Sequence, residues 1–134
     1  MDLKLFLKEN KTERERRSYC ATSSLLDEDG KPLEWVLRPV STRENEEIRE
    51  SAVMRRGGEY HFDAELYTAR LAAAAVEEPN LYNAQLQDSY GVSCPEDLLR
   101  EMVDNPGEYS ALVREVQDMN GFTSLKEKVD TAKN

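Results

Sequence analysis

A short alternating segment behind an Asp-Gly turn is the feature that most restricts the fold of this chain. The turn is the stretch Asp27-Glu-Asp-Gly-Lys-Pro32, where the glycine tolerates a positive φ and the Asp side chains can accept hydrogen bonds from nearby backbone N–H groups. Directly after it, Leu33, Trp35 and Leu37 alternate onto one face, which is the period of a β-strand. The pattern predicts a β-hairpin within residues 12–40.

The first strand of this hairpin is expected between Ser18 and Leu25, a stretch rich in strand-forming side chains that lacks a helical stripe. Pro39 cannot donate a hydrogen bond to a ladder, so it should lie near the end of the second strand or on an edge. Because an isolated hairpin is only marginally stable in water, the face that carries Trp35 should rest on helices.

Helices are predicted to follow the hairpin. The stretch Ser41-Thr-Arg-Glu44 matches the capping-box pattern and opens a helix that runs to about Met54. Two glycines break any continuation, so Arg55-Arg-Gly-Gly-Glu59 is predicted as a loop. Asp63 can then cap a helix from Ala64 to about Val76, where four consecutive alanines favour helix and allow a close approach by a neighbouring element.

Further helical segments are predicted in the C-terminal part, where apolar residues recur at helical spacing. Breakers at Gly91 and at Asn105-Pro-Gly107 separate them. The predicted segments are residues 82–90, 94–103 and 108–120, followed by a last segment at 123–133. The fold class is therefore α+β, an N-terminal β-hairpin packed on a bundle of about five short helices. We expect a single domain over residues 1–134, with the hairpin region at 12–40 and the helical region at 41–134.

The charge of the chain bears on which ligands it can bind. Its 18 basic and 27 acidic residues give a formal net charge of −9, and phosphate backbones repel such a protein, so nucleic acid is not expected as a ligand. Most of this charge lies in the C-terminal half: 12 basic and 13 acidic residues precede Asp63, whereas 6 basic and 14 acidic residues occur from Asp63 onward. A field of this kind favours solubility and attracts basic partners.

Composition also argues against a membrane or disulfide protein. No apolar run reaches the roughly 18 residues of a membrane span, and the N-terminal apolar stretch is too short for a signal-peptide core. Cys20 and Cys94 lie far apart and neither belongs to a CxxC pair, so both are expected to be reduced thiols in a cytoplasmic protein.

The residues for catalysis or metal binding are sparse. His61 is the single histidine, and a tight zinc site or a catalytic triad needs more partners than one histidine and two scattered cysteines supply. We interpret His61 as an ordinary histidine in a loop before a helix. The turn at residues 27–30 lacks the long loop and the terminal bidentate glutamate of a calcium site. We therefore expect no catalytic residue, no metal and no cofactor.

Four stretches, in this order along the chain, resemble the XkdN-like family of tail assembly chaperones from phages and prophages of Gram-positive bacteria. They are Asp27-Glu-Asp-Gly-Lys-Pro-Leu-Glu-Trp-Val-Leu-Arg-Pro-Val40, Leu86-Gln-Asp-Ser-Tyr-Gly91, Pro106-Gly-Glu-Tyr109 and Val116-Gln-Asp-Met-Asn-Gly-Phe122. No single stretch is specific, but the combination is. The resemblance implies a non-enzymatic protein that binds the tape measure protein, the helical rod that sets tail length. It also implies help with the assembly of tail-tube protein around that rod, in the cytoplasm of the bacterial host, and absence from the mature virion. The resemblance leaves open whether copies of the chain also associate with one another.

Apolar residues near the two ends are the candidate contacts with a protein partner. A chaperone for a helical rod needs accessible apolar ridges, with helix-in-groove contacts as the natural mode of binding. The candidates are Leu5, Phe6, Phe122, Leu125 and Val129. Ordinary packing within the domain is the competing interpretation for each of them.

Two other functions remain as alternatives. An acidic inhibitor that mimics nucleic acid would carry regularly spaced carboxylates along one surface. A small hydrolase would need a pocket that gathers His61 with two or more acidic side chains.

Overall fold

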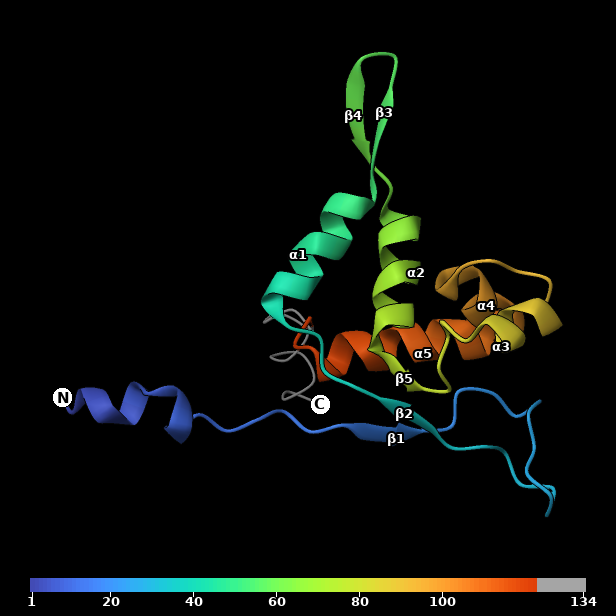
Figure 1. Cartoon of the computed structure of the whole chain (residues 1–134), viewed down its shortest axis with the longest axis horizontal. Helices are drawn as coiled ribbons and strands as arrows, with labels where there is room; N and C mark the ends of the chain where they lie inside the picture. Colours follow the sequence, from blue (N-terminus) through green and yellow to red (C-terminus); the bar gives the residue numbers. More distant parts are fainter. Residues whose placement is uncertain (123–134) are drawn as a thin grey trace, which may run out of the picture.

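The computed structural model describes residues 1–122 and has an α+β architecture, as predicted (Figure 1). A small antiparallel sheet lies against helices, and a second hairpin projects from the body. The elements in chain order are the 3₁₀ turns η1 (Leu3–Phe6) and η2 (Lys8–Asn10), β1 (Arg17–Tyr19), β2 (Trp35–Leu37), α1 (Thr42–Ser51), β3 (Val53–Arg56), β4 (Glu59–Phe62), α2 (Ala64–Ala75), β5 (Val76–Glu78), α3 (Ala84–Ser89), α4 (Pro95–Met102) and α5 (Pro106–Met119). The predicted segment at 123–133 lies outside the described residues.

The predicted pairing of two N-terminal strands is confirmed, and a third strand completes the sheet. Strand β1 pairs antiparallel with β2, with Tyr19 opposite Trp35. The other edge of β2 pairs antiparallel with β5, where Leu37 lies opposite Val76. Strand β5 is not predicted by the sequence pattern, because this three-residue strand follows α2 without a turn. Its first residue, Val76, was assigned to the end of the helix.

The first strand is shorter than predicted. Instead of running to Leu25, it ends at Tyr19, because the chain next turns toward the start of α5. The carboxylate of Glu108 accepts hydrogen bonds from the Thr22 hydroxyl at 2.7 Å and from the Ser23 backbone N–H at 2.9 Å. These bonds give the backbone and side-chain donors a partner outside the β-ladder. They also lower the pKa of Glu108 below its usual value.

The Asp-Gly turn forms as expected at the far end of the hairpin. The carboxylate of Asp27 accepts from the N–H groups of Asp29 and Lys31 at 2.8 and 2.9 Å, and Gly30 has a φ of 80°. Between this turn and the strands the ladder is reduced to one isolated bridge, Leu26 to Pro32.

The core forms where strand β2 meets the helices. Trp35 and Leu37 are both buried, as their alternation predicted, whereas Leu33 is exposed because the strand begins only at Trp35. Helix α2 contributes its alanine run to this core and contacts α1, α4 and α5. Since alanine side chains are short, the neighbouring helices can approach α2 closely. The other core residues of the helices include Leu98, Leu99, Met102, Leu112 and Val116.

Polar residues fix the starts of the helices. Ser41 and Glu44 form the predicted capping box, with the Ser41 hydroxyl accepting from the Glu44 N–H at 3.1 Å. Asp63 caps α2 as expected, and asparagines cap α3 and α5 in the same way. Helix α1 ends at Ser51, one turn earlier than predicted.

The predicted loop at residues 55–59 is wrong. Strands β3 and β4 form an antiparallel hairpin there, and only Gly57 and Gly58 make its turn. Both glycines have positive φ, 59° and 83°, as a two-residue type I′ turn requires. A Gly-Gly pair between β-branched and aromatic residues was the signal for this hairpin in the sequence. Every residue from Val53 to Phe62 is exposed, so the hairpin stands out from the body (Figure 1).

Within residues 1–122, every helix falls short of the length and apolar content needed to traverse a lipid bilayer.

We predict that Trp35→Ala lowers the free energy of unfolding by about 3–5 kcal/mol, because it removes a fully buried indole and leaves a cavity. The thermal midpoint should fall by roughly 10 °C or more in a calorimetric scan. Tyr82→Ala is the control, since Tyr82 is exposed and should leave the midpoint almost unchanged. A Trp35→Ala midpoint equal to that of the wild type would contradict this account of the core.

Candidate functional site

The N-terminal arm (residues 1–13) is the first exposed apolar surface. Each of its residues is exposed, and Figure 1 shows it extending away from the helices and the sheet. Leu5 and Phe6, two predicted contact residues, are 70% and 68% exposed, and Leu3 and Leu7 beside them are exposed as well. Local hydrogen bonds shape the arm, including one from the Lys4 N–H to the Asp2 carboxylate at 2.9 Å.

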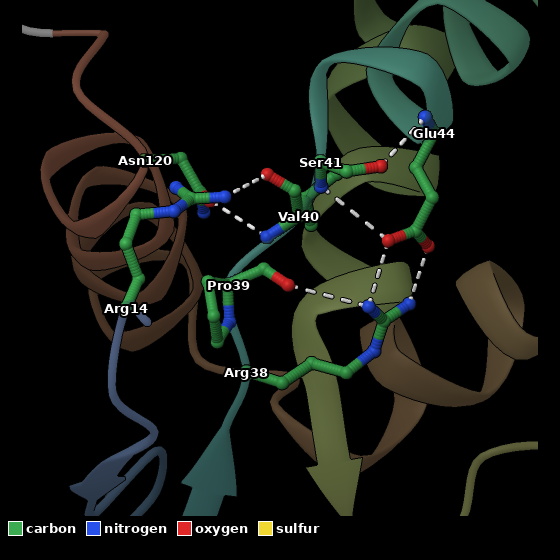
Figure 2. Close-up of polar contacts among 7 residues, drawn as sticks. All are labelled: Arg14, Arg38, Pro39, Val40, Ser41, Glu44 and Asn120. Atoms are coloured by element: carbon green, nitrogen blue, oxygen red, sulfur yellow. Dashed lines mark hydrogen bonds and ion pairs between the residues drawn. The ribbon is translucent and has the colours of Figure 1, made fainter. Parts of the chain in front are cut away.

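The arm is anchored at Arg14. Its guanidinium donates to the Val40 carbonyl and, at 3.1 Å, to the side-chain oxygen of Asn120 (Figure 2). The same Asn120 oxygen accepts from the Val40 N–H at 2.7 Å, and the Asn120 amide N–H₂ donates to the Val116 carbonyl at 2.8 Å. One asparagine at the end of α5 thus joins the arm, the chain after β2 and the last turn of its own helix.

Two further ion pairs hold the chain that follows this anchor. Arg16 pairs with Glu77 of β5 at 2.7 Å, and Arg17 pairs with Glu115 of α5 at 2.7 Å. Both glutamates are therefore engaged by arginines and not presented as free carboxylates. This pairing disfavours a continuous acidic surface of the kind that a nucleic-acid mimic would carry.

Phe122 lies beside the base of the arm. It is 45% exposed and lines a hollow of about 400 Å³ together with Lys11, Arg14 and Asn45. The structure thus brings Phe122 near the arm that carries Leu5 and Phe6. Leu125 and Val129, the remaining predicted contact residues, lie outside the described part of the chain.

A second exposed apolar surface was missed in the sequence because it depends on the β3–β4 hairpin. Val53 and Phe62 lie opposite each other at the base of this hairpin and are 41% and 49% exposed. With Glu46, Arg49 and Glu50 of α1 they line a hollow of about 450 Å³, which we call the trough. The trough is therefore apolar on its hairpin side and charged on its helix side.

The rest of the hairpin carries aromatic and basic side chains. The guanidinium of Arg55 lies 5.8 Å from the centre of the Tyr60 ring, within the range of a cation–π contact. The rings of Phe62 and Tyr67 lie 5.6 Å apart, which connects the hairpin to α2.

His61 lies on β4, in the hairpin, rather than in a loop. Its ring is mostly exposed and the Glu59 carboxylate is 3.9 Å from its Nε2 atom. Within residues 1–122, no group of three or more His, Cys, Asp and Glu side chains is placed to hold a metal ion. Both cysteines are free, and burial raises the pKa of the Cys94 thiol to about 11, so this thiol stays protonated near neutral pH.

Comparison with known proteins identifies the family. A model of the phage XkdN-like tail assembly chaperone protein matches residues 3–133. The chain belongs to this family. Two relatives of this chaperone come from Bacillus subtilis (strain 168). The phage-like element PBSX protein XkdN is 23% identical over 139 aligned residues, covering 99% of this chain and 94% of that protein. The uncharacterized protein YqbN is 22% identical over 139 residues, covering 99% of this chain and 93% of that protein.

A solved structure supports the fold of the chaperone. The crystal structure of the protein YqbN superposes with a TM-score of 0.80 at 19% identity, covering 92% of this chain and 98% of that one. The family resemblance that the sequence indicated is therefore confirmed, and the exposed arm and trough are surfaces of a phage tail assembly chaperone.

One ion pair fixes α1, the helix that forms one side of the trough. The Arg38 guanidinium donates to both carboxylate oxygens of Glu44, at 2.9 and 2.6 Å, while the Ser41 N–H donates to the same carboxylate (Figure 2). The bonds from Arg38 are the main reason why the pKa of Glu44 lies below its usual value, and the pKa of Arg38 is raised in turn.

We predict that Glu44→Gln destabilises the protein by less than about 1 kcal/mol at neutral pH, because the pair is partly exposed. A carboxylate whose folded-state pKa is lowered stabilises the fold above its unfolded value, about 4.3, and loses this effect as the pH falls through the lowered pKa. The difference in thermal midpoint between wild type and Glu44→Gln should therefore be largest near pH 7 and shrink below about pH 4.

Glu47→Gln is the matched control, since Glu47 lies on the same helix and its carboxylate makes no hydrogen bond or ion pair with any residue in the described range. A Glu44→Gln deficit that persists unchanged in acid would contradict the assigned role of the ion pair.

Proposed function

We propose that this tail assembly chaperone binds the tape measure protein and assists the assembly of tail-tube protein around it. The observation that carries the proposal is the N-terminal arm, in which Leu5 and Phe6 are about two-thirds exposed in the free chain. Contiguous exposed apolar residues of this kind mark interaction sites in soluble proteins. The family to which the chain belongs supplies the context of tail assembly.

The chemistry of the arm suits a helical client. Leucine and phenylalanine side chains can fill the grooves along an amphipathic helix, and burying each contributes about 1.5–3 kcal/mol. A short arm without a core of its own can adapt to several positions along a rod. Meanwhile the net charge of −9 keeps a complex of chaperone and apolar client in solution.

The contact residues of this proposal are the five inferred from the sequence. Leu5 and Phe6 lie on the arm, and Phe122 lies near its base. Leu125 and Val129 are proposed to extend the same contact.

The same proposal has three further parts. The chaperone acts in the cytoplasm of the host, it is absent from the finished virion, and it binds its client without catalysis. A chaperone that holds an assembly intermediate has to be released once tail-tube subunits cover the client. Moderate affinity, through a small number of apolar side chains, permits that release.

Co-expression with the tape measure protein of the same phage genome tests the proposal. We predict that the wild-type chain keeps the tape measure protein soluble and co-purifies with it. Leu5→Asp combined with Phe6→Asp should lower the co-purified amount by about tenfold or more, because two apolar contacts worth over 1.4 kcal/mol together are lost. Phe122→Asp with Leu125→Asp tests the other end of the contact in the same way.

Leu26→Asp is the control, because Leu26 is an exposed leucine in the hairpin loop, away from the arm. Each variant is first shown to be folded by its thermal midpoint. An insoluble client beside folded wild-type chaperone would overturn the proposed function, and full capture by the arm variant would overturn the contact residues.

A further inference from the structure

The trough is an apolar hollow with acidic side chains along one side. Glu46 and Glu50 are one helical turn apart on α1, and both are exposed. Neither carboxylate makes a hydrogen bond or an ion pair with any other residue between 1 and 122. Across from them, Val53 and Phe62 present apolar surface to solvent. An occupant that fits this hollow combines apolar side chains with basic ones.

The N-terminal arm has this composition. Lys4 and Lys8 flank the exposed residues Leu5 and Phe6, so both basic and apolar groups occur within one helical turn of each other. Like the two glutamates of the trough, the two lysines are four positions apart. The segment from Lys4 to Lys8, which contains no acidic residue, is thus complementary in charge to these two glutamates, and the arm and the trough both present apolar side chains.

Neither surface is covered by another of residues 1–122 of the same molecule. The arm leaves the body on the side away from the β3–β4 hairpin (Figure 1), and both Leu5 and Phe6 stay largely exposed. Short 3₁₀ turns without tertiary contacts are marginal in water. Leaving an apolar arm and an apolar hollow both in solvent is unfavourable, since their burial against each other would release ordered water.

We propose that the arm of one copy of this chain binds in the trough of a second copy. Leu5 and Phe6 pack against Val53 and Phe62, while Lys4 and Lys8 lie near Glu46 and Glu50. Arg49, which also lines the trough, is compensated by the acidic residues of the arm. The trough residues involved are Glu46, Arg49, Glu50, Val53 and Phe62, and the acidic residues of the arm are Asp2, Glu9 and Glu13.

The contact joins two different surfaces, the arm of one copy and the trough of another. Two copies that exchange arms reciprocally form a closed dimer, whereas a one-way exchange forms a chain of copies. An arm of this length buries less than the roughly 1,200–2,000 Å² of a standard interface, so the association depends on concentration in the micromolar range. In both arrangements the same substitutions abolish it.

This inference does not depend on the proposed client. The apolar residues of the arm are the ones proposed to meet the tape measure protein, so a second copy covers them while no client is bound. The test uses the purified chain alone, and its failure would leave co-purification with the client unaffected.

Sedimentation velocity over a range of concentrations is the experiment, with charge reversals that leave the core untouched. The arm variant is Lys4→Glu with Lys8→Glu, and the trough variant is Glu46→Lys with Glu50→Lys. We predict that wild type associates and that each variant alone associates at least about tenfold more weakly. Leu26→Glu, the control in the hairpin loop, should associate like wild type.

Mixing the two variants is the decisive measurement. The arm variant keeps an intact trough and the trough variant keeps an intact arm, so the mixture should regain association that neither shows alone. Combining all four reversals in one chain should also restore it, because the charges are complementary again. No contact between two arms or between two troughs predicts this recovery.

Three results would overturn the proposal. The wild-type chain could stay monomeric up to about 1 mM, where even an association of millimolar strength is visible. The trough variant could associate like wild type, which would assign the contact to the arms alone. The mixture could remain monomeric although each variant is folded, which would mean that the lysines of the arm and the glutamates of the trough do not face each other.

Discussion

Burial of the central strand β2 is the constraint on which the rest of the structure depends. Its residues Trp35 and Leu37 carry the apolar side of a three-residue strand into the core, and its two edges hold β1 and β5. Because β5 directly follows α2, pairing with β2 also places that helix in the core. The chain after β2 is then bound to Asn120, so the last turn of α5 is tied to the same strand. A strand this short is stable only because it is paired on both edges and covered by helices.

Much of the fold could be predicted because its signals are local. Caps such as Ser41 and Asp63 act within one helical turn, and the stripe of α5 states which face is buried. Long-range contacts carry no such signal. The hydrogen bonds of Glu108 with Thr22 and Ser23 end the first strand early, yet these residues are more than 80 positions apart. Strand β5 is similarly defined by its partner, since its own three residues do not distinguish a strand from the end of a helix.

The candidate surfaces were predictable only in part, for the same reason. An apolar segment at the N-terminus with flanking lysines is visible in the sequence, but its exposure is not, because packing within the domain would use the same residues. Phe122 is predicted as a contact because it is apolar and lies near the C-terminal end, and its position beside the arm depends on the Arg14 and Asn120 contact. The trough exists only because β3 pairs with β4. This pairing was not predicted, because the two glycines were interpreted as the break after a helix. The tertiary structure was therefore needed to locate the exposed apolar surfaces.

Because the β3–β4 hairpin is completely exposed, substitutions in its sequence have little effect on the stability of the fold. Since no residue from Val53 to Phe62 is buried, exchanges within this segment leave the hydrophobic core intact, provided that the two turn glycines keep their positive φ. Related phages could therefore diverge in this segment without redesigning the scaffold. For protein engineering, the hairpin is a site where a foreign recognition loop can be grafted.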